Sequence, residues 1–210
     1  AYDISLGLVG SEMCIRDRYV GADGKVIDGK SLYTHYAVGV PGTVAGMEHA
    51  LKKWGSLPLS TVIAPAAKLA DKGFTVSETL AKILEQEKKN MGQWPATQAI
   101  FWRNGEPLKR GDRLVQKDLA QSLRLIGQQG SKVFYEGSIA RKIAAEMAPH
   151  AGALSLQDLK SYKVAEREPL RGTYRGYEIV TMPPPSSGGA HLIQILNMIC
   201  LLYTSDAADE

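Results

Sequence analysis

The spacing of apolar residues along the chain predicts a series of amphipathic helices. In the stretch TVSETLAKILEQEKKN, the residues Leu80, Ile83 and Leu84 recur at helical spacing and are expected to form one buried face. Thr75 and Glu78 have the spacing of a capping box at the start of this helix. The same periodicity recurs in segments 37–55, 59–74, 117–129 and 138–148. We therefore expect a helix-rich fold.

Shorter extended elements are expected between and after these helices. Asn104-Gly105 lies between apolar and aromatic residues and predicts a two-residue β-hairpin. The stretch EPLRGTYRGYEIVTM predicts two short strands. AHLIQILNMI, which begins at Ala190, predicts a helix that is apolar on most faces. This order of elements predicts an α/β or α+β fold, and the lack of a complete sheet indicates part of a domain.

The two ends of the chain share an unusual coding property. CLLYTS, which begins at Cys200, can be encoded by TGTCTCTTATACACATCT, and the reverse complement of that DNA encodes MCIRD, the residues from Met13 to Asp17. Such an inverted repeat resembles a sequencing adapter read through at both ends of an insert. We therefore expect 1–18 and 200–210 to be translated adapter and 19–199 to be the native segment. The alternative interpretations are a disulfide between Cys14 and Cys200, or two free thiols.

The charge balance argues against a nucleic-acid partner. The chain carries a formal net charge of +3, and segment 19–199 has 23 basic and 16 acidic residues, a net charge of +7. This excess is spread through mixed runs such as EQEKKN and LKRGDR, which are typical of a solvated surface rather than of a basic stripe. No apolar run approaches the length of about eighteen residues that a membrane span needs.

The most unusual stretch is MPPPSSGGAH, residues 182–191. Its prolines favour an extended chain, Ser186 or Ser187 can cap the following helix, and Gly188 and Gly189 keep the first turn free of side chains. Free amides at such a helix start favour an anion or a developing oxyanion. Two interpretations stay open: a corner that faces a substrate, or a rigid turn whose serines only cap the helix.

Other catalytic or metal-binding patterns are weak. Ser187 and His191 lack the G-x-S-x-G context of a serine hydrolase. GVPGTVAG lacks the Lys-Ser/Thr pair of a phosphate loop. The histidines stand apart in the sequence without the H-E-x-x-H spacing of a zinc site, so no metal site is predicted from His35, His49, His150 and His191.

Several stretches together resemble the γ-glutamyltransferase (glutathione hydrolase) family. They occur in family order: AVGVPGTVAGMEHALKKWG, APAAKLADKGFTVS, LVQKDLAQSL, FYEGSIARKIA and LSLQDLKSYKVAEREPLRGTYRGYEIVTMPPPSSGGAHLIQILN. The stretch AIFWRNGEPLKRGDRLVQ resembles the Gram-negative periplasmic members. The resemblance covers nearly all of 19–199 and identifies this segment with the later part of the family's large subunit.

The resemblance implies an N-terminal-nucleophile hydrolase with a four-layer αββα sandwich, of which this chain is a helix-rich portion. In that family an exported precursor cleaves itself into a large and a small subunit. A threonine at the start of the small subunit attacks the γ-glutamyl amide of glutathione, with its own α-amine as the base. The resemblance therefore implies a periplasmic enzyme that needs no metal or cofactor, and a small subunit as the partner of this chain.

No catalytic residue is expected within the chain. The family's threonine corresponds to a position beyond Ile199, and the arginine that pairs with the substrate carboxylate corresponds to a position before Tyr19. The resemblance leaves Ser186, Ser187, Gly188 and Gly189 as candidates for the wall of the substrate cavity. Two alternatives stay open: a related acylase acting on glutaryl or cephalosporin amides, and a noncatalytic periplasmic binding protein on the same scaffold.

Overall fold

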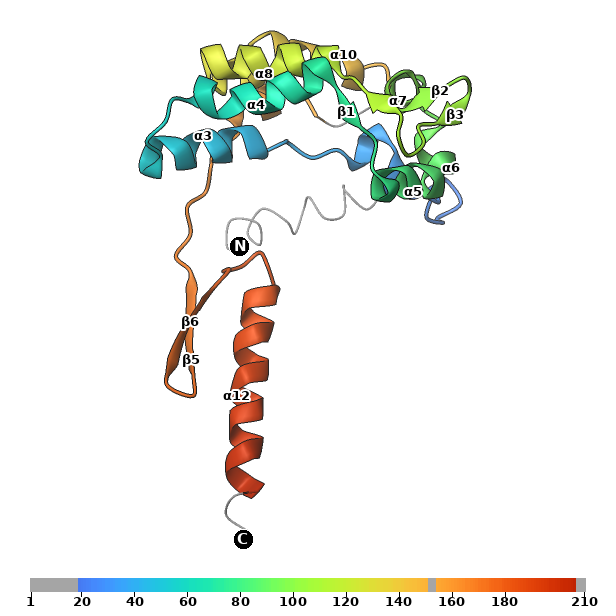
Figure 1. Ribbon diagram of the computed structural model, residues 1–210. Coiled ribbons are helices and arrows are strands. Elements are labelled where there is room, and N and C mark those ends of the chain that lie inside the picture. The colour runs from blue at the N-terminus through green and yellow to red at the C-terminus, as the bar shows by residue number, and fades with distance from the viewer. Residues whose placement is uncertain (1–18, 151–153, 207–210) are drawn as a thin grey trace. The chain divides into compact units, whose positions relative to one another are not determined.

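The computed structural model describes residues 19–150 and 154–206, with side chains described as far as Ile199. The chain divides into two compact units (Figure 1): Val26–Val164 form one, and Ala1–Lys25 with Ala165–Glu210 form the other. The predicted adapter segment 1–18, with Cys14 of the alternative disulfide, lies outside the described residues, as do 207–210. The backbone of 200–206 continues the last helix.

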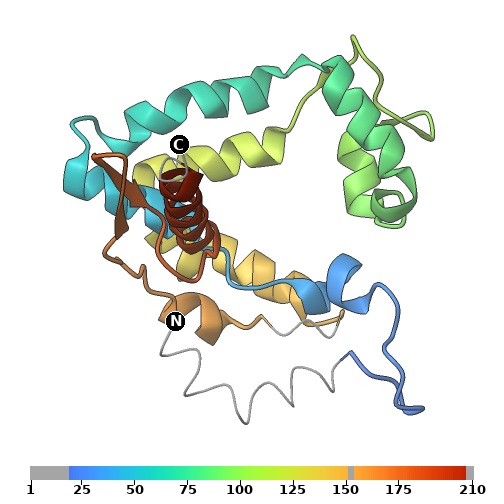
Figure 2. The same cartoon turned by 90° about the horizontal axis from the view of Figure 1, so that it is seen from below.

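Helices make up most of the unit Val26–Val164. α4 (Leu59–Lys72) and α8 (Lys117–Gln129) lie side by side (Figures 1 and 2). A Cβ at Gly127 would lie 3.3 Å from the Cα of Ser60, so a glycine on α8 permits this close approach. The other helices are α2 (Lys30–Tyr33), the 3-10 helix η1 (His35–Ala37), α3 (Thr43–Trp54), α5 (Glu78–Gln86), α6 (Lys88–Met91), α7 (Pro95–Phe101), α9 (Lys132–Tyr135), α10 (Ser138–Met147) and α11 (Leu156–Ser161).

Two short antiparallel ladders connect the helices of this unit. β1 (Phe74–Thr75) pairs with β4 (Arg113–Leu114), and β2 (Trp102–Arg103) pairs with β3 (Glu106–Pro107). The predicted hairpin turn is confirmed, since Asn104 and Gly105 between β2 and β3 both have positive φ, at 54° and 81°. The flank before it was predicted to be extended, but α7 runs as far as Phe101. Pro95 at the first position of α7 supports that helix.

The start of α5 differs from the prediction. Ser77, not Thr75, is the N-cap, because the Ser77 Oγ accepts a hydrogen bond from the Leu80 N–H at 3.1 Å. Thr75 is instead paired with Arg113 in the β1–β4 ladder. The predicted apolar face is only partly buried: Leu84 is 1% exposed, whereas Ile83 is 47% exposed.

The unit contains two clusters of buried apolar side chains. One is formed by Val76, Leu84, Leu108 and Leu114, around α5 and the β1–β4 ladder. The other joins α9, α10 and α11 and is formed by Tyr135, Ala140, Met147, Leu154 and Leu159. The Tyr135 hydroxyl donates to the carbonyl of Pro41 at 2.6 Å and accepts from the Ala45 N–H at 3.2 Å, which attaches the start of α3 to this second cluster.

A largely buried carboxylate, Glu48 of α3, joins that helix to the turn between α8 and α9. It accepts hydrogen bonds from the backbone N–H of Ser131 at 3.2 Å, from the Ser131 hydroxyl, and from the Lys52 ammonium at 3.0 Å. Burial alone would raise the pKa of Glu48, but the hydrogen bonds from Ser131 and Lys52 outweigh burial and lower the pKa below its usual 4.5.

Replacement of Glu48 by glutamine is expected to lower the free energy of unfolding at neutral pH by about 1–3 kcal/mol, because the Ser131 and Lys52 donors lose a charged acceptor. The lowered pKa stabilises the folded state above pH 4.5, and this contribution is lost as the pH falls through the folded-state pKa. Urea unfolding across this range should show the two proteins converging at acidic pH. A difference that does not change with pH, or an equal loss in the control Glu85→Gln on the exposed face of α5, would contradict this role.

The second unit contains a hairpin and the last helix. β5 (Leu170–Tyr174) and β6 (Tyr177–Thr181) pair antiparallel, as the sequence predicts, with Leu170 opposite Thr181. α12 (Gly188–Asp206) packs on β5, where a Cβ at Gly172 would lie 3.0–3.3 Å from Ile193. Several apolar side chains of α12 remain 44–56% exposed: Leu192, Ile195, Met198 and Ile199. In the described part of the chain, no helix has both the length and the apolar character needed to cross a membrane.

Candidate functional site

The proline-rich corner connects β6 to α12. Ser186, Ser187 and Gly188 are exposed, whereas Gly189 is buried. The Ser187 carbonyl accepts a hydrogen bond from the His191 N–H at 3.0 Å, which is the first helical hydrogen bond of α12. The predicted helix start is therefore confirmed, with Ser187 in the backbone position of the N-cap.

The serine side chains do not cap the helix as the sequence interpretation expected. Among the described residues, no hydrogen bond to the Oγ of Ser186 or Ser187 is found, and none joins the side chains of Ser187 and His191. The two hydroxyls are therefore open to solvent at the start of a long helix. This geometry gives a nucleophile–base pair no support and leaves the hydroxyls accessible to a ligand.

Gly189 has a strict steric role at this corner. A Cβ built on Gly189 would lie 2.1 Å from the carbonyl oxygen of Met182 and 3.0 Å from the Thr181 side chain. The first turn of α12 therefore packs directly against the chain that leaves β6. The sequence predicted only that both glycines keep the first turn free of side chains; the structure adds close packing at Gly189, whereas Gly188 is exposed.

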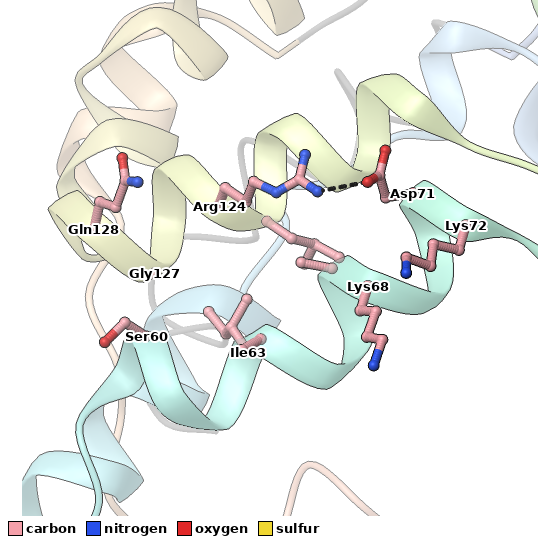
Figure 3. A pocket seen from close by; sticks show the side chains of 11 residues that line it. Ser60, Ile63, Lys68, Asp71, Lys72, Arg124, Gly127 and Gln128 are labelled. Atoms are coloured by element: carbon pink, nitrogen blue, oxygen red, sulfur yellow. Dashed lines mark hydrogen bonds and ion pairs between the residues drawn. The ribbon is translucent and has the colours of Figure 1, made fainter.

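A cavity of about 320 Å³ lies between α4 and α8 in the other unit (Figure 3). At one end the Arg124 guanidinium reaches from α8 to the Asp71 carboxylate on α4, at 2.8 Å, and Lys117 donates to the same carboxylate at 2.8 Å. The hydrogen bonds from Lys117 and Arg124 lower the pKa of Asp71. The Asp71 carboxylate is already paired with two cations, so it is not available as a general acid or base. We therefore interpret this cavity as a gap in the packing of α4 against α8.

A larger groove of about 720 Å³ lies between α3, α4 and α8 and is lined almost wholly by carbon. Among its large apolar side chains, Met47, Trp54 and Val62 are 48–71% exposed. A groove lined by apolar side chains from three helices is a surface on which another protein segment can pack.

The histidines do not all stand apart as the sequence indicated. His35, in η1, and His150, after α10, lie against the same carboxylate, that of Glu146. His49 is on α3, and His191 is exposed on α12 in the other unit. Sequence spacing could not reveal the proximity of His35 and His150, because the two residues come from distant segments of the chain.

Comparison with known proteins gives the same assignment as the sequence motifs. Residues 11–209 match the family model of gamma-glutamyltranspeptidase. The chain is 48% identical over 185 residues to the glutathione hydrolase proenzyme of Escherichia coli K12, which covers 88% of the chain and 32% of that relative. It is 38% identical over 186 residues to the acylase ACY 1 proenzyme of Pseudomonas sp. strain V22, which covers 89% of the chain and 33% of that relative.

The structural comparison agrees. The crystal structure of Helicobacter pylori gamma-glutamyltranspeptidase is similar with a TM-score of 0.83 and 43% identity, over 85% of this chain and 52% of that one. The predicted fold class, a helix-rich α+β portion of an N-terminal-nucleophile hydrolase, is thus confirmed. The chain spans about a third of the length of the curated relatives it matches. The resemblance predicted from the sequence motifs is also confirmed, and the chain belongs to the gamma-glutamyltranspeptidase family.

Proposed function

We propose that the protein carrying this chain cleaves the γ-glutamyl amide bond of glutathione and transfers the glutamyl group to water, an amino acid or a peptide. The observation that carries the proposal is the family match over 11–209, with 48% identity to a glutathione hydrolase proenzyme. That relative is a proenzyme, which supports a precursor that is processed before it acts.

The proposed chemistry places the nucleophile outside this chain. A threonine exposed by self-cleavage attacks the γ-glutamyl carbonyl, its own amine takes the hydroxyl proton, and that proton passes to the leaving amine. The acyl-enzyme ester is then broken by water or by an acceptor amine, which restores the threonine. Because one residue supplies both nucleophile and base, the proposed reaction requires no metal or cofactor.

The role proposed for this chain is to build and support the substrate cavity. Ser186 and Ser187 are exposed hydroxyls at the start of α12, and Gly188 follows them without a side chain. We place these residues, with Gly189, in the cavity wall. Direct contact with the γ-glutamyl group is assigned to none of them, and no residue of the chain is assigned a catalytic role.

The proposed partner is the small subunit of the same precursor. Two apolar surfaces support a second subunit, because a partner could bury them. They are the groove on α3, α4 and α8 and the exposed apolar side chains of α12. The proposed location is the periplasm, supported by the resemblance of AIFWRNGEPLKRGDRLVQ to Gram-negative periplasmic members. The mixed charge runs support small-molecule substrates rather than nucleic acid.

An acylase is the second candidate function, since the chain is also 38% identical to the acylase ACY 1 proenzyme. Full-length protein should be assayed with γ-glutamyl-p-nitroanilide and with glutaryl-p-nitroanilide, which differ only in the α-amino group. We expect p-nitroaniline release to be faster by more than about tenfold from the γ-glutamyl substrate, because an unmet contact to a charged group costs at least about 1.4 kcal/mol.

The other outcomes identify the alternatives. Preference for the glutaryl substrate would assign the protein to the acylases. Glutathione binding in calorimetry, without cleavage of either anilide and without self-cleavage, would assign it to the noncatalytic binding proteins.

A further inference from the structure

Three side chains of the kinds that ligate metal ions meet at the end of α10. Glu146 lies in the last turn of the helix, and His150 follows it by one turn. The His150 N–H donates to the Met147 carbonyl at 3.3 Å, so the chain still turns in a helical sense there. His35 approaches from η1, and one ligand atom from each of the three residues lies within 4.8 Å of the others.

Two separations in this cluster are longer than direct hydrogen bonds and close to the spacing of ligand atoms around a shared ion. The Glu146 Oε1 lies 3.4 Å from the His35 Nε2 and 3.6 Å from the His150 Nε2. An N–H···O hydrogen bond is shorter, at about 2.7–3.2 Å. A tetrahedral zinc ion with bonds of about 2.0–2.1 Å holds its ligand atoms about 3.3–3.5 Å apart. Both of these separations are within 0.3 Å of that spacing, and the ligand atoms of the two histidines lie within 4.8 Å of each other.

The cluster is partly exposed to solvent, and an aromatic side chain, that of Trp94, packs against its two histidine rings. The rings of His35 and His150 stack with centroids 4.1 Å apart and planes 12° apart. The Trp94 indole meets both rings edge-on, at 5.2 Å and 6.4 Å. The His35 side chain is 15% exposed and that of His150 is 45% exposed. The two rings must turn out of this parallel arrangement for their nitrogens to converge on one ion, and His150 is the more exposed of the two.

We propose that His35, Glu146 and His150 bind a divalent transition-metal ion, with zinc as the best fit. Two imidazole nitrogens and one carboxylate form a ligand set that suits zinc and its neighbours, whereas magnesium and calcium prefer oxygen ligands alone. Water is the expected fourth ligand, since the side chains of Glu146 and His150 are 64% and 45% exposed. The ion would tie the segment of α2 and η1 to the end of α10, a structural role separate from γ-glutamyl chemistry.

The first test is a calorimetric titration of tag-free, full-length protein with zinc chloride. We expect one equivalent to bind at this site, and no comparable heat with magnesium chloride. The variants His35→Ala, His150→Ala and Glu146→Gln should each weaken this binding by at least about tenfold, since even partners that only orient metal ligands are worth about 10–100-fold. His191→Ala, which removes an exposed histidine elsewhere, should bind zinc like the wild type.

Cobalt supplies a second readout that leaves the three proposed ligands unchanged. Cobalt bound by two imidazoles and a carboxylate in a four-coordinate site should give visible absorption bands and quench the fluorescence of Trp94, and Trp94→Phe should remove most of the quenching while zinc still binds. The proposal is overturned if wild-type protein shows no stoichiometric zinc binding, or if zinc affinity is unchanged in His35→Ala and His150→Ala. Circular dichroism without metal checks that each variant folds. If an alanine variant does not fold, the zinc affinity of the isosteric variant Glu146→Gln decides whether the site exists.

Discussion

Replacement of Gly189 by alanine is expected to lower the free energy of unfolding by about 3 kcal/mol, because the added methyl group overpacks a site closed by backbone. The new Cβ would lie 2.1 Å from the Met182 carbonyl oxygen, which cannot move without shifting the exit of β6. The Thr181 side chain at 3.0 Å closes the other side. The steric clash can therefore be relieved only if α12 moves away from the β5–β6 hairpin.

The neighbouring glycine provides a matched control for this prediction. A Cβ at Gly188 would meet only the Ser186 Oγ, at 3.6 Å, which is ordinary van der Waals contact. Gly188→Ala should therefore be neutral or slightly stabilising, since alanine is the better helix former. Urea unfolding of both variants in the full-length protein measures the difference. Equal stabilities would show that α12 does not pack on β6 as closely as the structure has it.

Replacement of Leu159 by alanine is expected to destabilise the protein by about 2–5 kcal/mol, because it leaves a cavity in a closed core. Leu159 is 0% exposed and packs with the buried cluster of α9 and α10, of which Tyr135 and Met147 are the largest members. Tyr135 also holds the start of α3 through its hydroxyl, so loosening this cluster affects more than α11.

Leu156, on the same short helix α11, is the control. Its side chain is 46% exposed, and Leu156→Ala should cost less than about 1 kcal/mol. Thermal unfolding of the two variants side by side gives the comparison. A Leu159→Ala protein that melts with the wild type would show that the cluster of Tyr135, Ala140, Met147, Leu154 and Leu159 is not a core in solution.

Much of the local structure was predictable because it is specified by neighbouring residues. The apolar period of α8 and α10 and the positive-φ residues Asn104 and Gly105 act over a few positions, and each gave the predicted element. The capping box of Ser155 and Asp158 at the start of α11 is equally local, since the two residues lie three positions apart. In each case the chain's own short-range geometry determines the outcome.

The errors arose where distant segments decide the local structure. Thr75 and Ser77 are both good capping residues, and the choice falls on Ser77 because Thr75 is drawn into a ladder with Arg113. The contact of His35 and His150 with Glu146 is a similar case, since no spacing within either segment indicates it. The corner at Ser186–Gly189 was recognisable from composition, but the exposure of its serines and the contact of Gly189 with Met182 required the fold.

The most direct test of the account is to compare p-nitroaniline release from γ-glutamyl-p-nitroanilide by the full-length protein and by the isolated 210-residue chain. If the nucleophile lies outside this chain, the full-length protein turns the substrate over and the isolated chain gives no release above buffer. Release by the isolated chain, or none by a full-length protein that has cleaved itself, would contradict the account.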